Sequence, residues 1–302
     1  MKPTHPTTPA DRVWTTGQLL VWIKSAFEKA RIDSPRLCAE LLVARVIGCD
    51  RLRLYVESDR PATVAERDRL RGLVRRALAH EPVQYLVEEA WFFSLPFHVD
   101  RRTLIPRPET ETIVQAVLQH ARATPAMGKG VIADIGTGSG CVIVALLKNL
   151  PEAHGVGIDL CPDALESARE NAQRHDVLDR LDLLQGDLLA PVMDHPAGRS
   201  VNYLVSNPPY IPDHEWAAVE ENVRKEPLVA LRGGVDGLQC IRPILENASR
   251  VLTPGGMLAI EFAESTADEV LSIAQRQPEL DNLRIETDFQ GKPRVLVGHR
   301  RP

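Results

Sequence analysis

The chain has 302 residues, of which 44% are hydrophobic and 25% charged, and its formal net charge is −5. This composition is ordinary for a globular protein with one large domain or two unequal ones. Apolar runs stay far below the ~18 residues of a membrane-spanning helix, and the start from Met1 to Pro6 lacks the apolar segment of a signal peptide. The acidic balance argues against bare DNA as the main partner, since such proteins usually carry a basic surface.

The cysteines give no sign of a metal site or a disulfide framework. The five of them are scattered and form no C-x-x-C pair: Cys38, Cys49, Cys141, Cys161 and Cys240. This pattern predicts reduced thiols in a protein of the cytoplasm, with no metal bound.

The first 82 residues predict a small helical domain. Residues 1–12 are rich in Pro and Thr and are expected to form a disordered tail. Residues 13–82 then contain apolar side chains at helical spacing, in segments that open at Thr15 or Thr16, at Ser34-Pro35 and at a capping box of Thr63 and Glu66. The third of these helices carries five arginines, which form either a solvated face or a docking surface for an acidic or nucleic-acid-associated partner.

Residues 83–104 change in character, because aromatic and β-branched side chains replace the helical pattern. The runs 83–87 and 91–97 predict a hairpin that links the helical domain to the rest of the chain. Two prolines then flank Arg107, which predicts a stiff loop that presents this arginine. We assign residues 83–104 to a linker hairpin and 105–302 to the larger domain.

From residue 130 the pattern alternates between strands and helices. The predicted strands are 131–135, 156–159, 181–184, 201–206 and 257–262. The helices between and after them are 142–150, 162–174, 236–252 and 266–275, and a hairpin of 283–288 and 294–297 closes the chain. Such alternation predicts an α/β fold: a doubly wound, mostly parallel sheet of seven strands with an antiparallel C-terminal hairpin.

A glycine-rich turn follows the first of these strands. It reads Gly136-Thr137-Gly138-Ser139-Gly140, and Asp134 stands two residues ahead of it. Dinucleotide sites read G-x-G-x-x-G and place a helix N-terminus against a diphosphate. The G-x-G-x-G spacing with a preceding carboxylate suits the cationic amino-acid end of a ligand better.

Acidic residues end the next two predicted strands. Asp159 lies 23 residues after Gly136, where a carboxylate can accept both hydroxyls of a ribose. Asp187, followed by Leu188, could accept the amino group of an adenine. A ligand with a ribose, an adenine, an ammonium group and no phosphate matches this set, and S-adenosylmethionine is such a ligand.

The fourth strand ends in Asn207-Pro208-Pro209-Tyr210. Prolines fix the backbone and restrict the residue before them, so this turn is stiff and extended at the sheet edge where α/β proteins bind ligands. The Asn207 side-chain oxygen and a neighbouring backbone carbonyl supply two acceptors, and Tyr210 supplies a flat ring. Two acceptors and a ring suit a planar, conjugated NH2 group.

Six segments spread over nearly the whole chain carry a resemblance to a known family. They are Ile105-Pro106-Arg107-Pro108-Glu109-Thr110-Glu111, Asp134 to Gly140, Gly157-Ile158-Asp159, Asn207 to Ile211, Glu226 to Leu231 and Asp236-Gly237-Leu238. With them the chain resembles the PrmC/HemK family, the release factor glutamine N5-methyltransferases. The Asn-Pro-Pro-Tyr turn is shared with amino-methylating enzymes in general, whereas the proline-arginine loop is found in far fewer families and is therefore the more specific motif.

The resemblance implies a class I S-adenosylmethionine-dependent methyltransferase fold behind a helical substrate-docking domain, residues 13–82. It implies an enzyme that methylates the glutamine of a Gly-Gly-Gln motif in class I release factors and forms S-adenosylhomocysteine. We expect a monomer, and the charge and the short apolar runs predict no direct DNA binding and no membrane binding. The implied cofactor-binding residues are Asp134, Gly136, Thr137, Gly138, Ser139, Gly140, Asp159, Asp187, Leu188 and Asn207. The implied catalytic residues are Asn207, Pro208 and Tyr210, and the implied substrate-binding residues are these three with Pro209 and Arg107.

The chain departs from the family pattern at three positions. Leu188 stands where the family often has an aromatic residue, so that the adenine contact is expected to be weaker. Glu88 and Ser94 stand where the linker hairpin usually has glycines, which leaves the geometry of its turn open.

In the expected mechanism, the Asn207 oxygen and the Pro208 carbonyl accept the two N–H bonds of the substrate amide and orient its nitrogen toward the methyl group. Neither a metal nor a covalent intermediate is needed. Three alternatives stay open at this point: methylation of a glutamine in a ribosomal protein, N6-adenine methylation of DNA, and a binding module that uses the fold as a scaffold. The DNA alternative would require base flipping and a basic recognition region.

Overall fold

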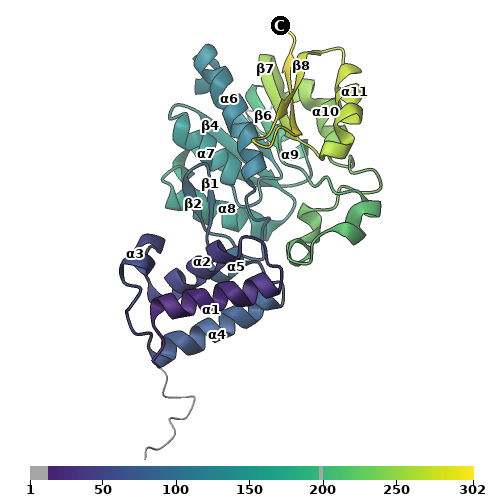
Figure 1. Cartoon of the computed structure of the whole chain (residues 1–302). Coiled ribbons are helices and arrows are strands. Elements are labelled where there is room, and N and C mark those ends of the chain that lie inside the picture. The colour runs from purple at the N-terminus through teal and green to yellow at the C-terminus, as the bar shows by residue number, and fades with distance from the viewer. Residues whose placement is uncertain (1–12, 197–199) are drawn as a thin grey trace, which may run out of the picture. The chain divides into compact units, whose positions relative to one another are not determined.

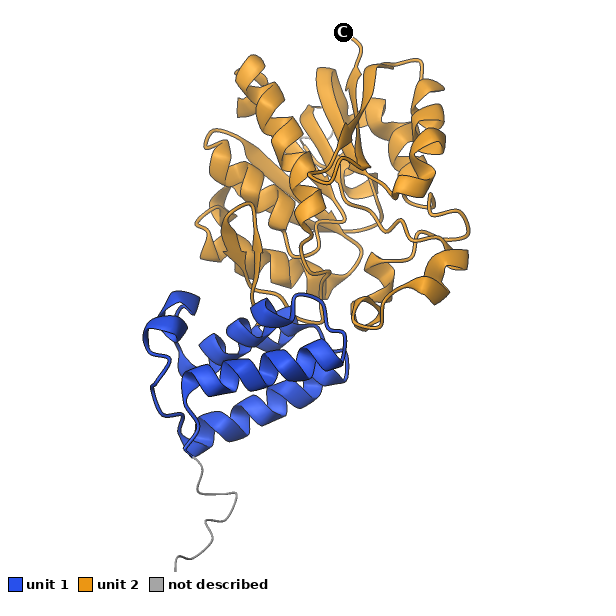
Figure 2. Ribbon diagram, in the orientation of Figure 1, with its two compact units in different colours: residues 1–87 blue, residues 88–302 orange. Residues whose placement is uncertain are grey.

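The computed structural model describes residues 13–196 and 200–302, and the chain divides into two compact units, Met1–Val87 and Glu88–Pro302 (Figure 2). The predicted disordered tail lies outside the described residues. Within the described part of the chain, no helix has both the length and the apolar character needed to cross a membrane.

The first unit is a bundle of helices. They are α1 (Thr16–Lys29), α2 (Pro35–Ile47), α3 (Arg51–Val56), α4 (Val64–Leu78) and α5 (Val83–Val87). Their apolar sides form one core, in which the side chains of α1, α2 and α4 are buried together. The unit therefore has a hydrophobic core of its own, as an independent domain requires.

The helix caps in this unit test the local predictions. Thr15 and Thr63 each form a complete capping box, with Gln18 and Glu66 respectively returning the bond. The box at Thr63 was predicted, whereas at Thr15 or Thr16 the sequence predicted only the start of the helix. Helix α2 begins at Pro35 as expected, but Ser34 makes no side-chain cap bond, because its backbone is left-handed with φ of 46°. Gly48 ends α2 in a left-handed conformation, in agreement with the sequence.

The prediction of a hairpin that begins at residue 83 was wrong in its first five residues. Residues 83–87 are helix α5, because Val83, Leu86 and Val87 are needed together on one side to cover the core of the first unit. The hairpin is shorter, with strands β1 (Ala90–Phe92) and β2 (Leu95–Phe97), and it belongs to the second unit.

The second unit contains a sheet of seven strands (Figure 1). They are β3 (Val131–Ile135), β4 (His154–Asp159), β5 (Leu181–Gln185), β6 (Val201–Ser206), β7 (Leu252–Glu261), β8 (Leu280–Thr287) and β9 (Pro293–Arg300). Their order is β5-β4-β3-β6-β7-β9-β8. The first five strands in this order are parallel, and β9 and β8 are antiparallel to their neighbours, so the predicted sheet is confirmed.

Helices cover both faces of this sheet (Figure 1). On one face, α6 (Glu111–Ala123), α7 (Cys141–Asn149) and α8 (Pro162–Arg174) pack side by side. On the other face, α9 (Ala190–Asp194), α10 (Ile241–Val251) and α11 (Ala267–Gln275) do so. The central strands are buried on both sides, which explains their nearly continuous apolar sequences.

Helix α10 begins five residues later than predicted. Asp236 accepts a hydrogen bond from the backbone N–H of Leu238, and Gly237 has φ of 78°, so these residues form a turn before the helix. The strand order places the carboxyl ends of β3, β4, β5 and β6 along one edge of the sheet. The two strands that flank the point where the order reverses, β3 and β6, bring the glycine turn and the Asn-Pro-Pro-Tyr turn together.

Candidate functional site

A pocket opens at this edge of the sheet. It is lined by most of the residues that the sequence predicted: Asp134, Gly136, Thr137, Gly138, Ser139, Asp159, Asp187, Leu188, Asn207, Pro209 and Arg107. Three of the predicted site residues, Gly140, Pro208 and Tyr210, are not among the described residues that line the pocket. Residues from five separate segments therefore meet in one cavity of the second unit.

The glycine turn has a backbone that only glycine adopts easily. Gly136, Gly138 and Gly140 all have positive φ, between 55° and 77°. A Cβ on Gly136 would meet nothing within 4 Å and would project into open space, whereas one on Gly140 would come within 3.2 Å of Ala168 on α8. Gly136 thus leaves room for a ligand, and Gly140 instead allows the turn to pack against a helix.

Asp159, at the end of β4, is joined to the same turn. Its Oδ2 accepts the backbone N–H of Gly138 at 2.9 Å, and its Oδ1 accepts that of Cys161 at 2.9 Å. Burial raises the pKa of this carboxyl, while the backbone donors pull it back toward its ordinary value. The carboxylate is held in place and lines the pocket, with lone pairs left for ligand hydroxyls.

Asp134 is almost fully buried below the turn, with 2% of its surface exposed. The Thr137 hydroxyl donates to its Oδ2 at 2.8 Å. Burial raises the pKa of Asp134 to about 7, and the charge of Asp159 adds to this effect. A buried carboxyl of this kind stabilises a nearby cation, since the cation compensates for the lost hydration of the carboxylate.

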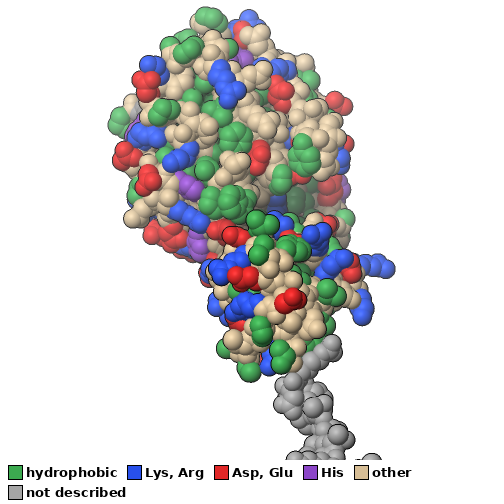
Figure 3. Space-filling model, turned by 60° about the vertical axis from the view of Figure 1, so that its left-hand side comes forward, with side chains coloured by type: hydrophobic (Ala, Val, Ile, Leu, Met, Phe, Trp, Pro, Cys, Tyr) green, Lys and Arg blue, Asp and Glu red, His purple; other side chains and the backbone are tan. Residues whose placement is uncertain are grey.

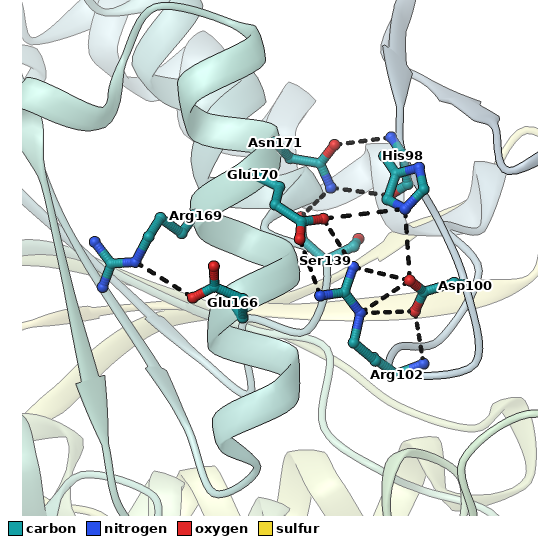
Figure 4. A network of polar contacts seen from close by, with 8 residues as sticks. All are labelled: His98, Asp100, Arg102, Ser139, Glu166, Arg169, Glu170 and Asn171. Carbon is teal, nitrogen blue, oxygen red and sulfur yellow. Dashed lines mark hydrogen bonds and ion pairs between the residues drawn. The ribbon is translucent and has the colours of Figure 1, made fainter.

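A buried amide supports the glycine turn from behind (Figure 4). Asn171 on α8 is fully buried and donates from Nδ2 to the backbone oxygen of Ser139 at 2.9 Å and to that of His98 at 3.0 Å. Its Oδ1 accepts the backbone N–H of His98 at 2.8 Å. Figure 4 also shows Arg102 between Asp100 and Glu170, with Nη2 contacts of 2.8 and 2.7 Å. The segment after β2 is thereby fastened to α8 and to the turn.

The Asn-Pro-Pro-Tyr turn is held by two partners that the sequence reading missed. Asn207 donates from Nδ2 to the hydroxyl of Thr110 at 3.0 Å, and Tyr210 donates from its hydroxyl to Glu261 at 3.1 Å. Thr110 and Glu261 are buried, with 2% and 0% exposure. The sequence did contain a sign of Glu261, because it is an acidic residue at the carboxyl end of a strand. Asp134, Asp159 and Asp187 were identified by the same criterion.

Arg107 lines the pocket but does not point freely into it. Its Nη2 contacts Oε1 of Glu226 at 2.5 Å, and Oε2 of the same carboxyl accepts the backbone N–H of Ile105 at 2.9 Å. Glu226 is 4% exposed, so the carboxylate of this ion pair is largely shielded from water. It fastens the proline-arginine loop to the loop that contains Glu226, and both loops border the pocket.

The pocket is also lined by the residues expected near adenine. Asp187 is exposed, and Leu188 is half-buried with a left-handed backbone, φ of 48°. The exposed Leu160 and the half-buried Cys161 and Cys240 line the same cavity. Aliphatic and sulfur-bearing side chains replace an aromatic platform here.

These residues fit S-adenosylmethionine. The open space at Gly136 gives room for a ligand chain, Asp134 suits its ammonium group, Asp159 suits its ribose hydroxyls, and Leu160 and Leu188 give an apolar slot for the base. The pocket presents carboxylates to its ligand, whereas a site for a diphosphate would require N–H donors at these positions.

Comparisons with known proteins place both units. A family model described as "PrmC N-terminal domain" matches residues 18–87, and one described as "Methyltransferase domain" matches residues 128–287. The chain is 39% identical over 268 residues to the release factor glutamine methyltransferase of Chlorobaculum tepidum, which covers 88% of this chain and 91% of the relative. It is 38% identical over 292 residues to that of Geobacter sulfurreducens, which covers 96% and 99%.

One solved structure agrees at the level of the fold. The hMettl16 catalytic domain, in complex with MAT2A 3'UTR hairpin 6, aligns at a TM-score of 0.50 with 15% identity over 69% of this chain and 76% of that one. A methyltransferase from Pyrococcus furiosus aligns at a TM-score of 0.49 with 15% identity, over 76% of this chain and 98% of that one.

Proposed function

The chain belongs to the family of release factor glutamine methyltransferases, and on this basis we propose the reaction that its pocket performs. It transfers a methyl group from S-adenosylmethionine to the side-chain amide nitrogen, N5, of the glutamine in the Gly-Gly-Gln motif of class I release factors. The enzyme acts in the cytoplasm as a monomer.

The orientation of the Asn207 amide carries this proposal. Its Nδ2 is already used in the bond to Thr110, so its Oδ1 is the atom left to receive a hydrogen-bond donor. Asn207 lines the same pocket as the glycine turn and Asp159. An acceptor beside a site that suits S-adenosylmethionine selects a substrate that brings an N–H, which a glutamine amide does.

The nitrogen of an amide is a poor nucleophile because its lone pair is delocalised into the carbonyl. The Asn207 oxygen and the Pro208 backbone carbonyl accept its two N–H bonds, which orients the nitrogen and favours positive charge on it. S-adenosylmethionine, when bound, supplies an electrophilic methyl group on a sulfonium. The nitrogen becomes acidic as the new N–C bond forms, and its proton then leaves to water.

The pocket residues divide between the two ligands. Asp134 and the turn from Gly136 to Gly140 hold the methionine end of the methyl donor, Asp159 holds the ribose, and Asp187 with Leu188 borders the adenine. Pro209 borders the glutamine side chain, and Tyr210 holds the turn in place through its hydroxyl bond to Glu261. Arg107 acts through its bond to Glu226, which shapes the loops around the substrate.

The test is incubation of the purified protein with labelled S-adenosylmethionine and, in parallel, a class I release factor, ribosomal proteins and duplex DNA. Mass mapping of the product is expected to find one methyl group on the glutamine of the Gly-Gly-Gln motif. Label on a glutamine of a ribosomal protein, or on adenine in DNA, would contradict this proposal and identify the ribosomal protein or the DNA as the substrate instead. Asn207→Ala is expected to lose about 10²-fold or more in kcat while the Kd for the methyl donor changes little.

The side chains on the face drawn in Figure 3 suit a protein substrate. On the face of the molecule in Figure 3, acidic and basic side chains are interspersed over the second unit, and apolar side chains lie between them. A DNA-binding enzyme of this type would need a basic surface along the duplex.

The first unit supplies the docking surface for the release factor. It carries large exposed apolar side chains, among them Val21, Leu52 and Val56 on α1 and α3, and its helix α4 carries five arginines. Deletion of residues 1–87 is expected to leave binding of the methyl donor intact and to abolish methylation of the intact release factor. Undiminished methylation by the second unit alone would remove the docking role.

A further inference from the structure

Glu261 is a buried carboxyl for which the reaction described above gives no role. It is the last residue of β7 and is fully buried. Strand β7 is parallel to β6, and Ile260 pairs with Ser206, so that the residues that follow this pair are Glu261, the last of β7, and Asn207, the first after β6. A carboxyl in such a place is costly unless hydrogen bonds compensate for the lost hydration.

One of its partners is the far end of the Asn-Pro-Pro-Tyr turn. The Tyr210 hydroxyl donates to Oε1 of Glu261 at 3.1 Å. Burial raises the pKa of Tyr210 well above its ordinary value, so this hydroxyl keeps its proton and remains a donor. The ring itself packs against the apolar core of the second unit, which leaves the hydroxyl bond to fix its position.

The near end of the turn is connected through Thr110. The Thr110 oxygen accepts Nδ2–H of Asn207 at 3.0 Å, so the single hydroxyl proton of Thr110 needs an acceptor elsewhere. Among the described residues, Oε2 of Glu261 is buried and has no hydrogen-bond partner. The Thr110 hydroxyl acts on this carboxyl to lower its pKa, and a rotation of the hydroxyl that directs its proton to Glu261 would satisfy both groups.

We propose that Glu261 is a positioning residue that holds both ends of the substrate-binding turn, Tyr210 directly and Asn207 through Thr110. The direction of this chain of bonds determines which atom of the Asn207 amide faces the pocket. With Nδ2 committed to Thr110, Oδ1 faces the substrate, whereas a flipped amide would present a donor to the N–H of the glutamine and repel it. The inference rests on the proposed function, because it explains how that site prefers a substrate NH2 group.

The protonation state of Glu261 bears on this arrangement. Burial raises the pKa of Glu261 to about 7, with Arg294 opposing and Glu109 adding to the shift. Arg294 is itself paired with Asp288 at 3.2 Å, and Cys141, whose thiol burial keeps protonated, also senses the charge of Glu261. An ionised Glu261 accepts from both hydroxyls. A protonated one can donate to Thr110 and compete with Asn207, so kcat is expected to rise as pH increases through about 7.

The experiment compares Thr110→Val and Glu261→Gln with Thr266→Val. The control also removes a buried threonine hydroxyl from this end of the sheet, one that donates to the backbone oxygen of Ala263 at 3.0 Å. For each variant, kcat and KM for a purified release factor are measured from pH 6 to 9, with the Kd for S-adenosylmethionine and the Tm.

Thr110→Val and Glu261→Gln are expected to lower kcat by about 10²-fold, with the Kd for the methyl donor close to that of the wild type. The kcat of Glu261→Gln should no longer rise with pH, because glutamine does not ionise. The double variant should be no worse than the weaker single variant, since both changes break one chain of bonds. Thr266→Val should keep the wild-type kcat.

Three results would overturn the inference while the wild type still methylates the release factor. One is a kcat of Thr110→Val equal to that of Thr266→Val, and another is losses that multiply in the double variant. The third is a rise in the Kd for the methyl donor that parallels the loss of kcat, which indicates general distortion of the pocket. If the Tm shows that Glu261→Gln does not fold, the kcat of Thr110→Val alone tests the inference. A wild type that leaves the release factor unmodified contradicts the proposed function instead.

Discussion

Replacing Asp134 by asparagine should stabilise the ligand-free protein at alkaline pH and weaken binding of the methyl donor. Burial raises the pKa of Asp134 to about 7, whereas an aspartate in the unfolded chain has a pKa of about 3.9. Because the folded state holds this proton more tightly, the free energy of unfolding falls as pH rises between these two values. Ionisation of Asp134 lowers the free energy of unfolding, and this destabilisation is fully present above pH 7.

The size of the penalty follows from the difference between the two pKa values. About three units at 1.36 kcal/mol each give up to ~4 kcal/mol at pH 8, and ~2 kcal/mol at pH 5.5. Asparagine has the shape of the protonated acid and keeps an oxygen for the Thr137 hydroxyl, but it does not ionise. The stability advantage of Asp134→Asn should therefore grow by ~2 kcal/mol between pH 5.5 and pH 8.

Urea unfolding at the two pH values, without ligand, measures this difference. Calorimetry of S-adenosylmethionine binding near pH 6.5 tests the second half, since an ammonium beside Asp134 favours its ionised form. The wild type should release protons on binding, detected as a dependence of the heat on the buffer, and Asp134→Asn should bind more weakly and release none. Equal unfolding free energies of the two proteins at pH 8, or equal proton release, would refute the reasoning.

Three other changes test the neighbouring structure. Ser94→Gly should raise the free energy of unfolding by ~1 kcal/mol, because Ser94 has φ of 63° in the hairpin turn; Ser272→Gly, inside α11, should lower it by a similar amount. In calorimetry, Asp159→Ala should raise the Kd for S-adenosylmethionine by ~10²-fold, as two charge-assisted bonds to the ribose are lost, and an unchanged Kd would reassign the ribose site. Chemical denaturation of Glu226→Ala should show a loss of ~2–3 kcal/mol, since the partly exposed Arg107 and a buried backbone N–H lose their acceptor. The double variant with Arg107→Met should recover part of that loss, and a further loss instead would mean that the ion pair itself matters little.

The local features of the sequence were sufficient for the elements and for most of the pocket. The helix start at Thr15, the capping box at Thr63 and the strand–turn–helix at Asp134 are encoded within a few residues, and the structure has them where the pattern predicts them. The errors lie where neighbours in space override a local preference. Residues 83–87 look like a strand but complete the core of a helical bundle, and residues 236–240 look helical but form a turn.

What the sequence by itself determined is the set of groups at the strand ends: the glycine turn, Asp159 and the Asn-Pro-Pro-Tyr turn, because parallel strands bring their carboxyl ends to one edge. Only the tertiary structure decided which partners hold those groups. Thr110 is 97 residues from Asn207, and Glu261 is 51 residues from Tyr210. Such pairs depend on which strands are neighbours and on which loop covers the edge, and no spacing along the chain records either. The direction of the Asn207 amide, on which its use as an acceptor depends, is set by those distant partners.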